Sequence, residues 1–282
     1  ITAAEVNKLR QITGAGMMDC KNALVEAEGD FDKAIDILRK KGQKIAAKRA
    51  DRSANEGFVV AKASNDATYA AVLMLNCETD FVGKTDDFTQ LASDILNHAV
   101  EILAVLDEGD AESILEQLKE SMLKGQTIEA LLTDMSGKTG EKIELNQFNV
   151  LEDAYVSYYN HNGNRLASIV AFNKTTQNLP TIGHEIAMQV AAMNPISVNE
   201  DSVPDDVKNH ELEIAKEQVR NEGKPENMVE KIAMGKLNKF FKENTLINQD
   251  FIRDNKKTVK QYMVEEDKDL VCKGFYRLQL GA

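Results

Sequence analysis

Residue types that bind phosphate are present in the sequence, but their spacing completes no known phosphate-binding loop. The closest pattern is Gly137-Lys138-Thr139, which would require a glycine five residues before Gly137, where Leu132 stands. A strand should also precede such a loop, and none is predicted there. We therefore expect that the chain does not bind a nucleotide directly.

The histidines and cysteines are scattered in the same way. No metal-ligand spacing relates any of the four histidines, His98, His161, His184 and His210. The odd number of cysteines favours reduced thiols packed among apolar residues, although a disulfide between two of them stays possible: Cys20, Cys77 and Cys272. Because no nucleophile has a recognisable base, we expect no enzyme, no metal site and no cofactor.

Two methionines at the start of a predicted helix are the first candidate contact site for another protein. Met17 and Met18 directly follow the Gly14-Ala15-Gly16 turn. Consecutive residues on a helix point about 100° apart, so both side chains can hardly face one small core. At least one should be exposed, where methionine makes an adaptable contact. The alternative is that both are buried.

The second candidate site lies between a predicted strand and the following helix. Here Thr79, Asp80, Phe81 and Val82 combine an acid with an aromatic and an aliphatic side chain. Binding residues concentrate in such connections between rigid elements. The alternative is that Asp80 caps a helix and Phe81 belongs to the core.

Helical patterns dominate the N-terminal part that must position the methionines. Three short helices are predicted within residues 1–42, the first beginning at a capping box of Thr2 and Glu5 and the third ending before Gly42. They would form a small helical bundle, and such a bundle suits a docking unit. The basic, alanine-rich residues 43–55 are predicted to be a helical linker.

Strand patterns then appear twice, which predicts an α+β fold with two repeated lobes and antiparallel sheets. Phe58 aligns with Ala154 at an offset of 96 (154 − 58), and a hairpin followed by a helix recurs at this offset. The first core lobe is predicted at 56–140, and the second at 141–200 plus 268–282. The acidic helical stretch 101–142 has no assigned role.

A helical hairpin is predicted at 203–245, inserted in the second lobe. Gly223 and Pro225 are the usual punctuation between two helices. The hairpin could pack against its own lobes, or pair with a second copy to form a homodimer.

The net charge of −12 argues against nucleic acid as the main partner. The basic run from Arg39 to Arg52 is a local exception, which is either a solvated helix end or an RNA-facing patch. No apolar stretch is long enough for a membrane span, and Ile1 to Leu9 lacks a signal-peptide core. We expect a cytoplasmic protein without membrane contact.

Both candidate sites carry a family resemblance. Thr13 to Lys21 (TGAGMMDCK), followed by Ala23-Leu24, is similar to the N-terminal signature of the elongation factor Ts family. Asn76 to Val82 (NCETDFV) resembles its second signature. The resemblance extends over nearly the whole chain and implies a guanine-nucleotide exchange factor that binds elongation factor Tu·GDP.

The resemblance also implies a role for each segment. A UBA-like N-terminal bundle with Met17 and Met18 would dock on the G domain of elongation factor Tu. Thr79 to Val82 would reach the nucleotide site, with Phe81 wedged between helices and Asp80 beside it, and would disturb the Mg²⁺ and phosphate contacts of GDP. The second lobe would hold another partner domain, and the hairpin would project as a coiled coil. The alternative function is an RNA-associated module that uses residues 39–52.

Overall fold

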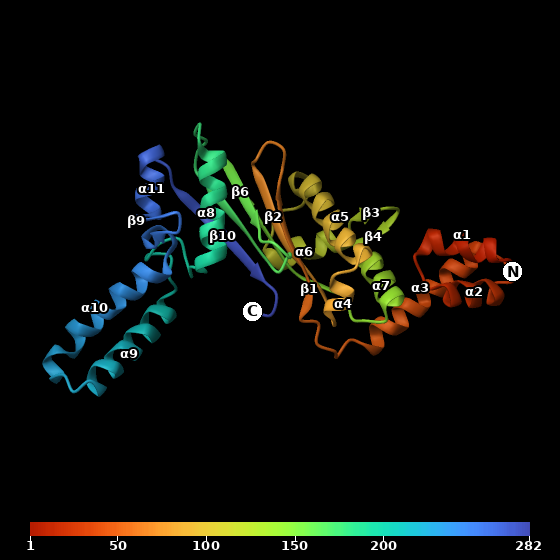
Figure 1. Cartoon of the computed structure of the whole chain (residues 1–282), viewed down its shortest axis with the longest axis horizontal. Helices are drawn as coiled ribbons and strands as arrows, with labels where there is room; N and C mark the ends of the chain where they lie inside the picture. Colours follow the sequence, from red (N-terminus) through yellow and green to blue (C-terminus); the bar gives the residue numbers. More distant parts are fainter.

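The computed structural model describes residues 1–282 and has a mixed α+β fold. Figure 1 shows an elongated molecule, with small helices at the N-terminal end, β-sheets in the middle and a long helix pair at the far end. None of its helices combines the length and the apolar character needed to cross a membrane.

The N-terminal helices are α1 (Ala3–Thr13), α2 (Met17–Glu26) and α3 (Phe31–Lys48). The predicted capping box of Thr2 and Glu5 is present, and the left-handed Gly14 ends α1. Asp30 caps α3 through the backbone N–H of Lys33. The three helices enclose a small core of their own, made of Val6, Leu9, Cys20, Ala23, Leu24, Ala27 and Ala34.

Helix α3 is longer than its sequence pattern predicted. It continues through Gly42 to Lys48, so the predicted end at Gly42 is wrong. The reason is close packing against α7 (Ile128–Thr139), because a Cβ atom on Gly42 would lie 2.9 Å from the carbonyl oxygen of Thr133. A Cβ on Gly137 would likewise lie 2.8 Å from the Cα of Gly42. Gly42 thus marks a contact between helices.

The first sheet contains β1 (Glu56–Ala63), β2 (Tyr69–Cys77) and β5 (Glu144–Glu152), all antiparallel, in the order β1-β2-β5. Its central strand β2 is buried along nearly its whole length. The sequence division assigned residues from 141 onward to the second lobe, but β5 pairs with β2 and therefore completes the first sheet. The remaining domain boundaries stay predictions.

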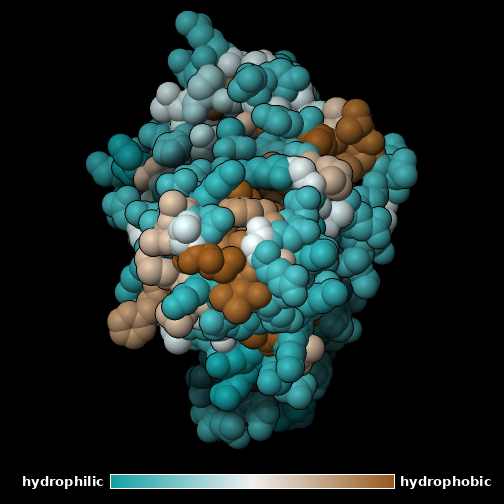
Figure 2. All heavy atoms as spheres, turned by 90° about the vertical axis from the view of Figure 1, so that its right-hand side faces the viewer, coloured by the Kyte–Doolittle hydropathy of each residue, from teal (hydrophilic) through white to brown (hydrophobic).

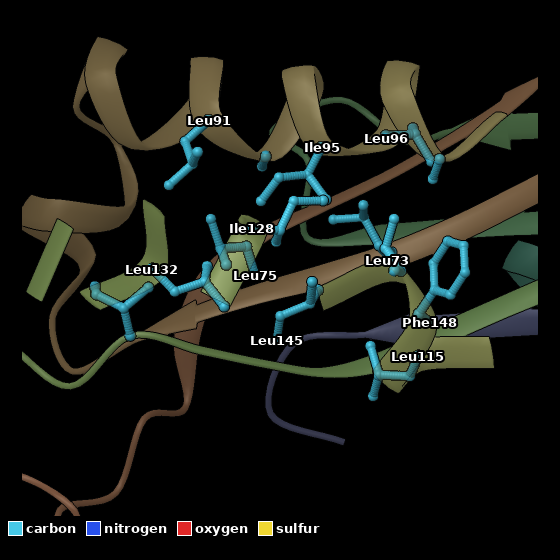
Figure 3. Packing of buried hydrophobic residues seen from close by; sticks show 14 of the residues in the cluster. Leu73, Leu75, Leu91, Ile95, Leu96, Leu115, Ile128, Leu132, Leu145 and Phe148 are labelled. Atoms are coloured by element: carbon cyan, nitrogen blue, oxygen red, sulfur yellow. The ribbon is translucent and has the colours of Figure 1, made fainter. Parts of the chain in front are cut away.

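Three helices cover the outer face of the first sheet: α5 (Asp86–Ile102), α6 (Ala111–Glu120) and α7. A 3₁₀ turn (Leu103–Val105) and a hairpin of β3 (Met122–Leu123) and β4 (Gln126–Thr127) lie between them. The largest hydrophobic core, of 19 buried residues, lies between these helices and the sheet (Figure 3). The predicted acidic helical stretch is therefore interrupted by a short hairpin.

The second sheet contains β6 (Tyr155–Asn160), β7 (Leu166–Phe172) and β10 (Cys272–Gln279), again antiparallel, in the order β10-β7-β6. The strand predicted near the C-terminal end is therefore present as β10. Helix α8 (Leu179–Met193) packs on this sheet. Its core also receives residues from a 3₁₀ turn (Leu246–Asn248), β8 (Asp250–Phe251) and α11 (Val259–Glu266); β9 (Asp254–Thr258) pairs with β8.

The two sheets share a third core on their inner faces. It contains 11 buried residues from β1 and β2 on one side and from β6, β7 and the β10 end on the other. The order of layers is therefore helices, sheet, sheet, helices. Separating the two sheets would expose this apolar core to water. The free-energy cost would be about 25 cal/mol for each Å² of apolar surface exposed.

Helices α9 (Asp205–Asn221) and α10 (Glu226–Asn244) pack against each other and extend away from the sheets (Figure 1). Gly223 has a φ of 75° and Pro225 is the N-cap of α10, in agreement with the predicted punctuation.

Candidate functional site

The residues after β2 form a one-turn helix, α4 (Asp80–Gly83), which places Phe81 on the surface. The hydroxyl oxygen of Thr79 accepts a hydrogen bond from the backbone N–H of Val82, so Thr79 is the N-cap. The Phe81 side chain is 82% exposed, the highest exposure among the large hydrophobic residues. The alternative interpretations, with Asp80 as the cap and Phe81 in the core, are wrong.

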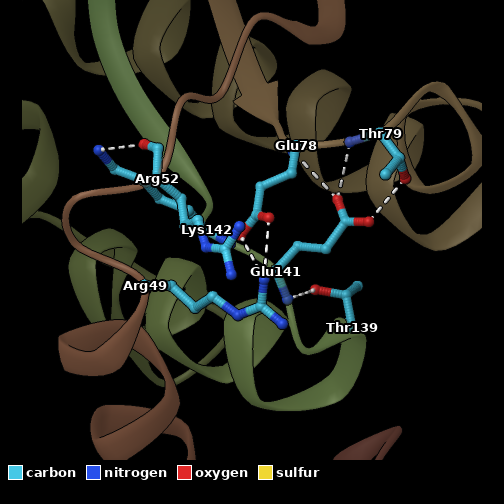
Figure 4. A network of polar contacts seen from close by, with 7 residues as sticks. All are labelled: Arg49, Arg52, Glu78, Thr79, Thr139, Glu141 and Lys142. Atoms are coloured by element: carbon cyan, nitrogen blue, oxygen red, sulfur yellow. Dashed lines mark hydrogen bonds and ion pairs between the residues drawn. The ribbon is translucent and has the colours of Figure 1, made fainter.

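A single carboxylate fixes the backbone where α4 begins (Figure 4). Glu141 Oε2 accepts hydrogen bonds from the backbone N–H groups of Glu78 and Thr79, at 3.0 and 3.1 Å. Its Oε1 accepts one from the Thr79 hydroxyl at 2.6 Å. Hydrogen bonds to an ionised acceptor are stronger than neutral ones, so Glu141 holds this turn in one orientation.

A second set of contacts links this turn to the end of α3. Glu78 pairs with Arg49, which follows α3, at 3.0 Å, and it accepts the backbone N–H of Lys142 at 2.8 Å. The Lys142 side chain donates to the carbonyl oxygen of Arg52 at 3.1 Å and pairs with Glu144. Figure 4 shows Arg49, Glu78 and Lys142 beside the Glu141 contacts. The N-terminal helices and α4 therefore share one polar network.

Close backbone packing supports α4 from below. A Cβ on Gly83 would lie 3.3 Å from both the N and O atoms of Gly57 and from the sulfur of Cys77. Gly57 has a φ of 150°, and a Cβ there would lie 1.9 Å from the Leu75 carbonyl oxygen, so only glycine fits. The short helix rests directly on β1 and β2.

The Cys77 thiol under α4 is not poised for chemistry. Burial and the nearby carboxylates of Glu141 and Glu56 raise its pKa to about 12. The thiol donates instead to the Thr79 carbonyl oxygen at 3.1 Å. A nucleophilic cysteine requires a lowered pKa, so Cys77 acts as a packing residue here.

The two neighbours of Phe81 have different roles in the geometry. Asp80 pairs with Lys84 at 2.7 Å, and the hydrogen bond from Lys84 lowers the pKa of Asp80 below its ordinary value. Val82 is half-buried and packs on the largest core. Asp80 therefore presents a carboxylate beside the exposed ring while Val82 anchors the turn.

Both candidate methionines are exposed, Met17 by 51% and Met18 by 62%. This confirms the prediction that at least one faces solvent, and neither lies in the bundle core. Ile12, at the end of α1, is 57% exposed. Figure 2 faces the N-terminal end and shows hydrophobic atoms gathered in patches within a mostly hydrophilic surface.

The structure does not bring the two candidate sites together into one cluster. Helix α4 lies beside the first sheet, whereas α2 lies at the N-terminal end of the molecule (Figure 1). A partner that contacts both must therefore be large, because α3 separates them. Such an arrangement is suited to binding a macromolecule over an extended surface.

The remaining charged motifs have structural contacts. Gly137-Lys138-Thr139 is the last turn of α7, where Lys138 pairs with Asp87, so it forms no loop. Within the basic run, Lys41 pairs with Asp19 and Arg49 with Glu78, which leaves an exposed row on α3 at Lys40, Lys44 and Lys48. An RNA contact by this row stays a prediction.

Sequence reasoning missed the residues that brace α4. Glu141 lies 62 residues after Thr79, and no local pattern connects a glutamate at that position with the turn. In the sequence, Arg49 stands out only as part of a basic run. The one available signal was Glu78 inside the second signature, an acid beside a strand end that could accept backbone or cationic donors.

Comparison with known proteins gives one consistent result. The family model described as elongation factor TS matches residues 78–282. The chain is 48% identical to elongation factor Ts of Christiangramia forsetii and 48% identical to that of Flavobacterium psychrophilum, in each case over 281 residues. It is 44% identical to the Porphyromonas gingivalis factor over 282 residues. Each alignment covers 100% of this chain and 99% of the relative.

Proposed function

Because the chain belongs to the elongation factor Ts family, we propose that it promotes GDP release from elongation factor Tu by inserting the Phe81 ring beside the nucleotide site. Its family function is guanine-nucleotide exchange on elongation factor Tu during translation, without catalytic chemistry of its own. The cytoplasmic location expected from the sequence is that of the family.

The exposure of Phe81 on a braced helix is the observation that supports this proposal. A phenylalanine that is 82% exposed gains little in the free protein, but it can bury a large apolar area in a partner. The hydrogen bonds to Glu141 and the close packing of Gly83 on Gly57 hold its backbone in place. A rigid anchor loses little conformational entropy on binding, so more of its contact energy is left to deform the partner.

Deformation of the partner accounts for exchange. GDP is held by phosphate contacts and by Mg²⁺, which bridges phosphate oxygens and protein ligands. A factor can bind the distorted pocket more tightly than the intact one. It then lowers the affinity of the pocket for GDP by the ratio of its own two affinities. Nucleotide must weaken factor binding by the same ratio, so an incoming nucleotide can release the factor. Asp80, beside Phe81, would add negative charge near the phosphates.

The remaining parts would enlarge the contact. In this proposal α1–α3 form a UBA-like module that docks on the G domain of elongation factor Tu through Met17 and Met18. The two sheets with their helices are repeated lobes, and the second lobe holds another domain of the partner. Helices α9 and α10 form the projecting coiled-coil hairpin.

Stopped-flow release of fluorescent GDP from elongation factor Tu tests the proposal. The unaltered chain should accelerate release, and Phe81→Ala should slow the stimulated rate about 30-fold, which is the size of a loss at an interface hot spot. The variant should remain folded because the side chain is exposed.

Val105→Ala is the matched control, since Val105 is 79% exposed on another element and its loss should leave the rate unchanged. If Phe81→Ala released GDP as fast as the unaltered chain, the insertion mechanism would be wrong, although the family function would stand.

A further inference from the structure

The outer edge of β1 is covered by the other half of the molecule. In the sheet order β1-β2-β5, β1 pairs with a neighbouring strand on one side only. An open edge presents unpaired N–H and C=O groups. On β1 these groups belong to Val59 and Ala61, whose side chains lie in the core between the two sheets. Their hydrogen-bond partners come from the end of β6 and from the turn between β6 and β7.

Two asparagines, Asn160 at the end of β6 and Asn164 in the turn after it, bond to β1 where a further strand would lie. Ala61 N–H donates to Asn160 Oδ1 at 2.8 Å, and Asn160 Nδ2 donates to the Ala61 carbonyl oxygen at 2.9 Å. Asn164 bonds to Val59 through both its backbone and its side chain: its backbone carbonyl oxygen accepts from Val59 N–H at 2.8 Å, and its side-chain Nδ2 donates to the Val59 carbonyl oxygen at 3.3 Å. We call these four hydrogen bonds the amide clamp.

The turn has a conformation that suits the amide clamp. Asn164 has a φ of 52°, a left-handed conformation that asparagine tolerates better than most residues. The next residue, Arg165, pairs with Glu56 at the start of β1 at 2.9 Å. A reciprocal contact exists at the other end, where the N–H of Val156 in β6 donates to Ala67 in the β1–β2 turn at 2.8 Å. The end of each hairpin is therefore hydrogen-bonded to a strand of the other sheet.

The clamped strand is the same strand that supports α4. Gly83 of α4 packs on Gly57, which lies two residues before Val59 on β1. At about 3.4 Å per residue, the clamp begins about 7 Å along the strand from that contact. Asn160 and Asn164, together with the core that the two sheets share, therefore fix the position of α4 relative to the second sheet.

We propose that Asn160 and Asn164 are positioning residues, which hold α4 and the second half of the molecule in the fixed relation needed to engage the partner at both places at once. This inference rests on the proposed function. Two contact regions on one rigid body bind more tightly than either alone, and that advantage disappears when their geometry is loose. The clamp thus sets how tightly the partner is bound, whereas Phe81 sets how fast GDP leaves once it is bound.

The test separates those two quantities by measuring GDP release against factor concentration. Asn160→Ala should raise the half-saturating concentration about tenfold and leave the maximal rate within about twofold of the unaltered chain. Asn164→Asp, which keeps the left-handed turn but removes the Nδ2 donor, should have a smaller effect in the same direction. Asn162→Ala, in the same turn and without a side-chain bond to β1, is the control and should change neither quantity.

Amide hydrogen exchange tests the clamp without the partner. In Asn160→Ala the protection of the Ala61 amide should fall, while that of Leu73 in the central strand β2 should not. An unchanged half-saturating concentration, or an equal loss of protection throughout the sheet, would overturn the positioning role. If the unaltered chain itself failed to release GDP, the proposed function would fail instead, so the two failures are distinguishable.

Discussion

Two exposed apolar sites, α4 and the start of α2, are supported in different ways. Helix α4 has a single turn, yet Glu141, Gly57 and the core of 19 residues fix it on the sheet. The methionines of α2 sit on a bundle whose core has only 7 buried residues. The side chains match this difference, since phenylalanine has few rotamers whereas methionine has three rotatable bonds.

In the proposed mechanism, this difference would divide the work of one interface between a rigid site and an adaptable one. A side chain that must deform a partner needs a rigid backbone beneath it. A flexible backbone would itself move on contact and leave the partner unchanged. A group that supplies contact area benefits from adapting its shape. We therefore expect substitutions in the residues that support α4 to have large effects on GDP release. Substitutions on α2 should have smaller effects on partner binding.

The largest effect should follow from removing the carboxylate under α4. Glu141→Ala leaves the backbone N–H groups of Glu78 and Thr79 without their acceptor, and we expect a loss of about 2 kcal/mol in the free energy of unfolding. The stimulated rate of GDP release should fall as well, because Phe81 loses its fixed base. Urea unfolding and stopped-flow release measure the two effects. The control is Glu120→Ala, an exposed glutamate without a side-chain contact; equal behaviour of both variants would refute the bracing role.

A smaller effect is expected where α3 joins the rest of the chain. Gly42→Ala forces a methyl group against the Thr133 carbonyl oxygen and should destabilise the protein by about 1 kcal/mol. Gly235→Ala is the matched control, because Gly235 lies in α10 and faces open space. Its alanine should raise stability by about 0.5–1 kcal/mol through better helix propensity. Thermal unfolding of both variants would contradict the close-packing argument if their shifts had the same sign.

The methionines should contribute moderately and separately. We expect Met17→Ser and Met18→Ser each to weaken binding to nucleotide-free elongation factor Tu about three- to tenfold, since each loses exposed contact area. Stability should change little, because both side chains face solvent. Titration calorimetry measures the affinity, with Met122→Ser, 59% exposed on β3, as the control. Full affinity in both α2 variants would remove the docking role.

The smallest effect concerns the ion pair on α4. Lys84 lowers the pKa of Asp80, so the ionised carboxylate stabilises the fold above the pKa that it has in the unfolded chain. This contribution is lost as the pH falls through the folded pKa. Lys84→Met should therefore raise the pKa of Asp80, and its small stability deficit at about pH 7 should disappear as the pH falls through the lowered folded pKa of Asp80. An NMR titration of the Asp80 carboxyl group checks the direction, and an unchanged pKa would contradict it.

Local patterns predicted the local features well. The Thr2 and Glu5 capping box and the exposure of Met17 or Met18 depend on neighbouring residues, so the sequence could reveal them. The mixed α+β class likewise followed from two kinds of periodicity. What could not be predicted depends on distant partners. Gly42 resembles a helix end until Gly137 is known to face it.

The same limit applies to the candidate site. Phe81 could be singled out because it is an aromatic residue in a connection, but its support could not. Glu141 and Arg49 reach the turn only because the chain folds back on itself from both directions. A single sequence shows which residues are unusual; their three-dimensional neighbours determine which of them are held rigid.

The buried thiol of Cys77 beneath α4 can serve as a probe of the local opening of this short helix. All three cysteines are buried, and Cys77 is enclosed by the turn that carries Phe81. Because the sulfur is fully buried, we expect an alkylating reagent to reach it when the turn detaches from the sheet. The rate of Cys77 modification would therefore report how often the turn opens. A lower rate in the presence of the partner would show that partner binding keeps the turn closed.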